Sequence, residues 1–253
     1  MKKILLIMAS VAAIVAFASC KKDNGKDKKE GEEETEYVQP ITIDGDFSDW
    51  AKLDASKIAT AKCAPDATKT ALKLVKVYAD EYFVFVYFEW DKDQISYHPN
   101  TAPADQDSNE EDVPFHVYIN GDGNAATGGF GDQWNDACTD VLMEGFLTDG
   151  TNIVSYEPGL FRWAGETNGT GWSWEDLGDI SGICSGAGIV GKYELSIVRE
   201  LYPVGKLADT FSIGFDIQQS WDSVGILPNA AANDDNPSGH TNSLQVTTVK
   251  AGK

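Results

Sequence analysis

A short polar loop at residues 120–124 carries the side chains best suited to hold a metal ion. It reads Asn120-Gly121-Asp122-Gly123-Asn124. Asn and Asp side chains supply oxygen atoms, and the glycines let the backbone turn tightly enough to aim carbonyls inward, which suits calcium. The same residues are also the commonest formers of solvated turns, and the spacing differs from that of an EF-hand loop. We predict a calcium site with Asn120, Asp122 and Asn124 as ligands.

A group of tryptophans in the second half of the chain could bind sugar. The apolar C–H face of a pyranose ring stacks on an aromatic ring, while its hydroxyl groups need polar side chains. Large rings also fill the cores of β-sandwiches, so the alternative is that some of these tryptophans pack inward. Trp134, in a glycine-rich loop, is predicted as the alternative exposed platform. The predicted ligand-binding residues are Trp134, Arg162, Trp163, Trp172 and Trp174, with Glu166 and Asn168 nearby.

Sequence signatures of common enzymes are missing. The chain has no G-x-S-x-G, H-E-x-x-H or G-x-x-x-x-G-K-[ST] motif, and its three histidines are scattered. Carboxylates are numerous, so a glycosidase pair stays open as an alternative. No C-x-x-C motif occurs, and Cys63, Cys138 and Cys184 form either one disulfide bond or buried free thiols. We predict a protein that is not an enzyme.

The elements that position these residues read as strands. The clearest is a hairpin of 72–78 and 82–90, in which both faces of the second strand are apolar, as in a central strand of a sandwich. A long polar loop, 91–112, precedes the strand that leads into the 120–124 loop. Further strands are expected at 41–43, 140–146, 151–156, 160–163, 172–174, 193–197, 211–217 and 244–248, with a short helical turn at 47–50. The pattern predicts an all-β fold in which Trp50 plugs one end of the core.

The first 36 residues are set apart by composition. Residues 1–19 have the basic start and apolar run of a secretory signal peptide, and Ala18-Ser19-Cys20 resembles the lipobox of bacterial lipoproteins, which places the acylated residue at Cys20. Residues 20–36 contain no aliphatic or aromatic side chain after the cysteine and read as a disordered charged tether. Residues 37–253 are predicted to form a single domain.

The charge of the chain excludes one class of partner. Its 40 acidic residues outnumber its 20 basic ones, and the formal net charge is −20. Nucleic-acid binding depends on basic patches that neutralise phosphates, so nucleic acid is not an expected partner.

Several segments together resemble the family-9 carbohydrate-binding modules and the wider DOMON-like superfamily, on a Bacteroidetes-type lipoprotein. The segments are Ile43–Trp50, the Tyr78–Asp91 hairpin, Tyr118–Asn124 with Thr127-Gly128, Asp140 with Glu144, and Tyr193–Ile197. The resemblance implies a jelly-roll-like antiparallel β-sandwich, structural calcium and an aromatic ligand slot. It adds Asp140 to the metal ligands, and this sequence has Asn120 where such modules usually place an aspartate.

We therefore expect a non-catalytic surface lipoprotein of the outer membrane that binds a polysaccharide or oligosaccharide and touches the membrane only through its lipid anchor. One alternative is an adhesion or accessory module that binds protein, which would be marked by a large exposed apolar patch. Another is haem binding, since some DOMON relatives use Met and His as axial ligands. The residues available for that role are Met143, His98 and His116.

Overall fold

The computed structural model describes residues 37–95, 113–130, 133–136, 138–147, 159–179, 183–201, 203–219 and 222–250. The chain divides into two compact units, Met1–Val38 and Gln39–Lys253. The predicted signal peptide, Cys20 and tether lie outside the described residues, as do His98, most of the polar loop and the strand expected at 151–156. Within the described residues, no helix has the length and apolar character needed to cross a membrane. All further description concerns the second unit.

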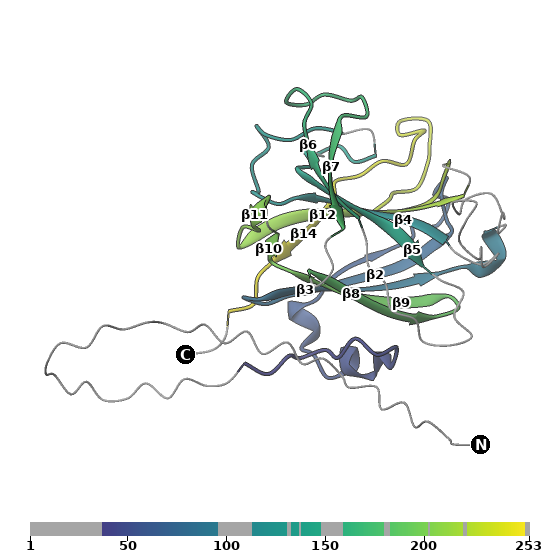
Figure 1. Cartoon of the computed structure of the whole chain (residues 1–253). Helices are drawn as coiled ribbons and strands as arrows, with labels where there is room; N and C mark the ends of the chain where they lie inside the picture. Colours follow the sequence, from purple (N-terminus) through teal and green to yellow (C-terminus); the bar gives the residue numbers. More distant parts are fainter. Residues whose placement is uncertain are drawn as a thin grey trace, which may run out of the picture. The chain divides into compact units, whose positions relative to one another are not determined.

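This unit is built from two antiparallel sheets that pack as layers (Figure 1). The first has the order β1-β2-β3-β9-β8, and the second has the order β13-β12-β4-β5-β6-β7, with β14 also paired to β12. Strands of the first sheet are β1 (Ala59–Lys62), β2 (Leu72–Ala79), β3 (Phe83–Trp90), β8 (Cys184–Ile189) and β9 (Lys192–Val198). Strands of the second are β4 (Val113–Asn120), β5 (Val141–Leu147), β6 (Gly159–Trp163), β7 (Trp174–Asp179), β12 (Thr210–Gln219), β13 (Asp222–Leu227) and β14 (Leu244–Thr247). The predicted all-β, jelly-roll-like antiparallel sandwich is confirmed.

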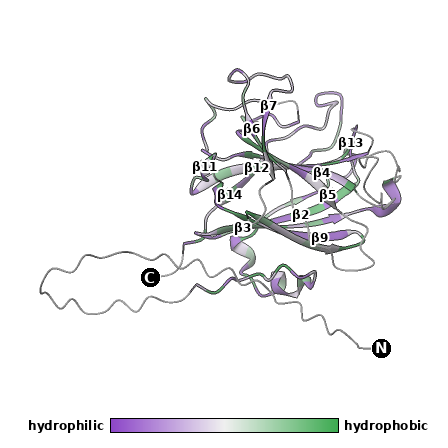
Figure 2. Ribbon diagram, in the orientation of Figure 1, coloured by the Kyte–Doolittle hydropathy of each residue, from purple (hydrophilic) through white to green (hydrophobic). Residues whose placement is uncertain are grey.

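The main core lies between the two sheets. Val84, Val86 and Phe88 alternate along β3 and point into it, and all three are fully buried. Phe88 meets Phe115 of β4 at 5.6 Å and Phe215 of β12 at 5.4 Å between ring centroids. Figure 2 shows hydrophobic residues along strands of both layers. Because side chains alternate along a strand, the residues between these core positions face outward, and both outer faces need a cover.

The N-terminal segment covers the outer face of the first sheet. It contains two short 3₁₀ helices, η1 (Phe47–Ala51) and η2 (Ala55–Lys57). Trp50 packs in a separate cluster with Phe85 and Tyr87 of β3, so it does not plug the end of the main core as expected. The strand expected at 41–43 is also absent from this described segment, because the Thr42 amide donates to the Asp49 carboxylate rather than to a neighbouring strand.

The outer face of the second sheet carries another cluster, formed by Tyr118, Trp134, Leu142 and Ile226. Loops rather than a sheet cover it, and the candidate site lies among them. Two further strands, β10 (Glu200–Leu201) and β11 (Gly205–Lys206), form a small hairpin, and η3 spans Lys92–Gln94.

No disulfide bond joins any of the three cysteines in the described part of the chain. Cys138 and Cys184 are buried and Cys63 is half-buried. Of the two alternatives that the sequence left open, a disulfide bond among these three cysteines is therefore not found.

Candidate functional site

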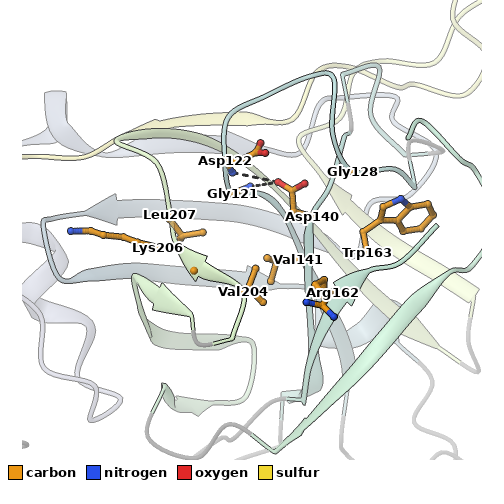
Figure 3. Close-up of a pocket in the computed structure, with 11 residues that line it drawn as sticks. Gly121, Asp122, Gly128, Asp140, Val141, Arg162, Trp163, Val204, Lys206 and Leu207 are labelled. Atoms are coloured by element: carbon orange, nitrogen blue, oxygen red, sulfur yellow. Dashed lines mark hydrogen bonds between the residues drawn. The ribbon is translucent and has the colours of Figure 1, made fainter. Parts of the chain in front are cut away.

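The predicted metal loop is held against Asp140, the residue before β5. Strand β4 ends at Asn120, and the amides of Gly121 and Asp122 both donate to Asp140 Oδ2, at 2.9 and 3.4 Å (Figure 3). Gly123 has a φ of 66°, which a side chain would disfavour, so the tight turn depends on this glycine.

Two of the four predicted metal ligands come together. Burial, and then the negative charge of Asp122, raise the pKa of Asp140 to about 6, against an ordinary value of 3.8. Asp122 also accepts bonds from the Asn124 amide and the Thr127 hydroxyl, both at 2.8 Å. The pair of adjacent carboxylates is unfavourable unless a proton or a cation lies between them.

The side chains of the other two predicted metal ligands, Asn124 and Asn120, have different hydrogen-bonding surroundings. Asn124 Oδ1 accepts from the Ala126 amide at 3.0 Å and so caps its own turn. Asn120 is buried, and its Oδ1 has no hydrogen-bond partner among the described residues. The described residues contain no group of three or more His, Cys, Asp or Glu side chains arranged for a metal ion.

A pocket opens beside this loop, with a volume of about 270 Å³. Its wall combines the acidic pair, two basic side chains and three aliphatic ones (Figure 3). The residues that line it are Gly121, Asp122, Gly128, Asp140, Val141, Arg162, Trp163, Val204, Gly205, Lys206 and Leu207. Arg162, predicted as a ligand contact, lines this pocket and forms an ion pair with Glu175 on β7.

Trp163 connects the pocket to a surface of aromatic rings. Its indole N–H donates to the Glu166 carbonyl at 3.1 Å, and its ring meets Trp174 edge-on at 5.2 Å between centroids. The ring lies so close to Gly129 and Gly165 that a Cβ at either position would collide with it. The half-buried ring of Trp163 therefore packs tightly between the loops that carry these two glycines.

Trp172 is the exposed member of the aromatic group, with 57% of its surface accessible. Phe130 meets it edge-on at 5.5 Å between ring centroids, and Trp174 does so at 6.4 Å. The centroid of the His116 ring lies 6.2 Å away. The structure thus brings Trp163, Trp172 and Trp174 into one group and leaves Trp172 facing solvent.

Trp134 is not an exposed platform, and that prediction is wrong. Only 1% of its surface is accessible, and its indole N–H donates to the Pro228 carbonyl at 3.0 Å. Its ring packs directly on Gly214 of β12, where a Cβ would be only 2.5 Å from the ring, and beside Tyr118. The glycine leaves space on the outer face of the sheet, which the indole fills.

A buried polar cluster lies next to Trp172. His116 Nε2 is 3.1 Å from Glu144 Oε2, and His116 Nδ1 lies 3.0 Å from Gln218 Nε2 and 3.2 Å from the Tyr118 hydroxyl. In the neutral imidazole, the amide group of Gln218 is a donor to Nδ1, so Nε2 carries the proton that Glu144 accepts; the protonated imidazole donates from both nitrogens. Asp216, fully buried, accepts from Gln218 at 2.9 Å.

Burial and the neighbouring carboxylates change the pKa values of two groups in this cluster, His116 and Tyr118. Burial works to lower the pKa of His116, but the carboxylates of Asp216 and Glu144 outweigh it and raise that pKa above its ordinary value. Burial also raises the pKa of the Tyr118 hydroxyl, so this group stays protonated as a donor.

Sequence reasoning missed most of this cluster. From the sequence, His116 is considered only as a haem ligand, whereas in the structure it belongs to this cluster and only 4% of its surface is accessible. The available signal was a polar residue at every second position of two strands: His116 alternates with core residues on β4, and Asp216 and Gln218 do so on β12. That β4 and β12 are neighbours, with His116 opposite Asp216, could not be deduced from either strand alone.

The structure excludes Met143 and His116 as a pair of axial ligands for haem. Met143 belongs to the main core between the sheets, whereas His116 bonds on the outer face of the second sheet. The sheet itself separates the two side chains, so they cannot serve as axial ligands of one haem.

Comparisons with known proteins add one likeness. No family model matches the chain, and no curated protein matches it. Among solved structures, it is similar to a carbohydrate-binding module of family 9 from Caldicellulosiruptor kristjanssonii in complex with cellotriose. The identity is 12%, the match covers 86% of this chain and 93% of that chain, and the TM-score is 0.36. At these values the likeness says nothing about what this chain binds.

Proposed function

We propose that this protein is a non-catalytic carbohydrate-binding protein and that the sugar stacks on Trp172. The observation that carries the proposal is an exposed indole ring next to a buried cluster of hydrogen-bonding side chains. A pyranose has an apolar face and a rim of hydroxyl groups, so it matches a ring with polar neighbours. Phe130 and Trp174 support Trp172 through T-shaped contacts, and 57% of the surface of Trp172 stays accessible to a ligand.

Protein binding is the weaker interpretation. A protein-docking surface usually carries a contiguous apolar patch. Among the described residues of the sandwich, the exposed large hydrophobic side chains are Tyr82, Trp172 and Ile189, and they lie on different parts of the fold. A single exposed ring beside polar groups favours a small polar ligand.

The Trp172→Ala variant tests the proposal. Aromatic stacking contributes about 1 kcal/mol beyond the area that it buries, so removing the ring is expected to weaken binding at least about tenfold. The measurement is affinity electrophoresis and calorimetry against a panel of soluble polysaccharides. Tyr82→Ala is the matched control, because Tyr82 is 53% exposed and lies beside β3 in the other sheet. Unaltered affinity in Trp172→Ala, or no binding by the wild-type protein to any polysaccharide, contradicts the proposal.

We further propose that calcium binds at Asp122 and Asp140 and stabilises the 120–124 loop. Their adjacent carboxylates and the unpartnered Oδ1 of Asn120 fit a hard cation. When bound, the ion would supply charge neutralisation between the carboxylates. The side chain of Asn124, which caps its own turn, contributes through the loop conformation rather than as a ligand.

Location at the outer surface of the outer membrane is also a proposal. It is supported by the apolar run and the Ala18-Ser19-Cys20 sequence, with Cys20 as the acylated residue. The charged segment that follows would act as a spacer between the lipid and the sandwich. Fractionation of a Cys20→Ser variant tests this anchor.

A further inference from the structure

The side chains next to Trp172 offer more hydrogen-bond acceptors than donors. Asp216 Oδ2 accepts from Gln218 at 2.9 Å, Ser223 at 2.8 Å and Gln133 at 3.3 Å. Among the described residues, however, Asp216 Oδ1 and the side-chain oxygens of both glutamines are buried without a partner. An unsatisfied buried acceptor is unfavourable. These oxygens are inaccessible themselves, so their effect at the surface is a negative potential that favours the approach of donors.

The cluster also carries negative charge. Glu144 has a side chain 33% exposed, Asp216 is fully buried, and His116 lies between them at 3.1 and 3.9 Å. With a neutral imidazole the three groups sum to two negative charges, and with a protonated imidazole to one. The basic side chain of Arg162, on β6 of the same sheet, is ion-paired with Glu175 and so does not offset this charge.

The exposed indole ring of Trp172 is a third feature that favours a cationic ligand. The face of an indole ring has a negative electrostatic potential, which attracts an ammonium group held at the rim of a stacked sugar. The molecule as a whole, with a formal net charge of −20, attracts cationic ligands and repels acidic ones over longer distances.

From these three observations we infer that the Trp172 surface prefers a glycan whose sugars carry a free, protonated amine, such as a 2-amino-2-deoxyhexopyranose, over a neutral or an acidic one. The inference rests on the proposed carbohydrate binding and names the class of sugar. The pyranose ring stacks on Trp172, the ammonium group donates toward Glu144 and experiences the negative potential of Asp216, and the remaining hydroxyl groups face solvent.

Three β-1,4-linked hexamers that differ only at the 2-position test it: those of glucose, glucosamine and N-acetylglucosamine. We expect the glucosamine hexamer to bind the whole protein about tenfold more tightly than the glucose hexamer at a mildly acidic pH. The N-acetylglucosamine hexamer, which has no charge, is expected to bind no more tightly than the glucose hexamer. Because the preference is electrostatic, about 0.5 M NaCl is expected to reduce it several-fold.

Two variants separate a local effect from general attraction to an acidic protein. Glu144→Gln keeps an acceptor for His116 but removes the charge, so it is expected to weaken binding of the glucosamine hexamer more than that of the glucose hexamer. Glu200→Gln, on the exposed side of β10, changes the net charge equally and is expected to leave the ratio unchanged.

The outcomes are distinguishable. If the glucose hexamer binds as tightly as the glucosamine hexamer, the preference for amines is wrong while carbohydrate binding stands. If Trp172→Ala binds the glucosamine hexamer as well as the wild-type protein does, the attraction is non-specific and the inference is overturned. Binding of none of the three hexamers overturns it as well, and the polysaccharide panel then decides the proposed function separately.

Discussion

Trp134 and Trp172 have the same side chain and opposite surroundings. Trp134 fills the space left by Gly214 on the outer face of the second sheet, and its N–H finds a backbone carbonyl. Trp172 makes T-shaped contacts with Phe130 and Trp174 and keeps 57% of its surface exposed. The role of each ring is therefore decided by whether a neighbouring strand offers a gap and an acceptor.

Asp140 provides a prediction at the level of one carboxyl group. Its pKa is raised to about 6 in the folded protein, so the unfolded chain loses this proton at a lower pH than the folded one does. The stability associated with the protonated form is complete below about pH 4 and is lost as the pH rises through about 6. In chelator, Asp140→Asn is therefore expected to gain about 1–2 kcal/mol relative to wild type between pH 4 and pH 8, after allowance for partial exposure. Denaturant titrations at both pH values measure the difference.

Calcium bound at the proposed site is expected to reverse the stability advantage of Asp140→Asn over the wild-type protein. At pH 8 the ion binds the two carboxylates of the folded wild-type protein, which is expected to raise its melting temperature, whereas Asp140→Asn gains little. Asp234→Asn, an exposed carboxyl group elsewhere, is expected to behave like wild type. If the wild-type melting curve is the same in calcium and in chelator, the proposed calcium site is wrong. If the stability difference between Asp140→Asn and wild type does not change with pH, the predicted titration of Asp140 is wrong.

The sequence located parts of the site but not their arrangement. The loop at 120–124 stands out as a run of oxygen-bearing side chains and glycines directly after a predicted strand, and the tryptophans at 163, 172 and 174 stand out as large rings close together in the sequence. Asp216 and Gln218 lie about a hundred residues from His116, and only the pairing of β12 with β4 brings them into contact. Local patterns carry no information about such pairing, so the polar cluster was not predictable as a unit.

At the level of elements, Glu194 fastens the N-terminal segment to the first sheet. This fully buried side chain of β9 accepts from the Trp50 indole N–H at 3.0 Å and from the amides of Asp44 and Gly45 at 3.2 and 3.0 Å. Burial raises its pKa although these three donors favour the carboxylate. The tight turn that presents the two amides requires a φ of 80° at Gly45.

Replacing this acceptor is expected to loosen the covering segment. In Glu194→Gln one oxygen becomes an NH₂ group that faces an N–H donor, and such a mismatch in a buried site costs about 2–3 kcal/mol. For a domain of this size, the melting temperature is expected to fall by about 4–12 °C. Differential scanning calorimetry measures the shift, and Glu89→Gln, on the same sheet but partly exposed, is expected to shift it far less. A fall of less than about 1 °C for Glu194→Gln would show that the segment is held by its apolar contacts alone.

Strands with strong side-chain alternation were predictable, and strands of small residues were not. The hairpin of β2 and β3 and the long β12 follow the expected ranges closely, because large apolar residues occupy alternate positions. Strand β8 reads Cys-Ser-Gly-Ala-Gly-Ile and β1 reads Ala-Thr-Ala-Lys, so neither has a hydrophobic pattern of its own. Both lie at edges of the first sheet, where pairing with β9 and β2 determines their conformation.

At the level of the whole molecule, charge and proposed lipid anchor act in opposite directions at a membrane. A net charge of −20 is repelled by an anionic lipid surface, so the folded protein has no electrostatic reason to stay there. Acyl chains contribute about 0.8 kcal/mol for each buried CH₂ group, which is sufficient to hold a protein when two or more chains are attached. Attachment is then expected to depend on Cys20 alone.

The Cys20→Ser variant tests this dependence. It is expected to move the protein from the membrane fraction to the soluble fraction at any salt concentration, because no second attraction remains. Cys63→Ser is the control: Cys63 is a half-buried free thiol of the sandwich, and its replacement is expected to leave the protein with the membrane. Immunoblots of fractionated cells measure the distribution. Metabolic labelling with a fatty acid checks the acylation, which is expected in the wild-type protein and in Cys63→Ser but not in Cys20→Ser. If Cys20→Ser stays in the membrane fraction, the anchor is not a lipid on this residue, and a protein partner in the membrane has to hold the molecule there.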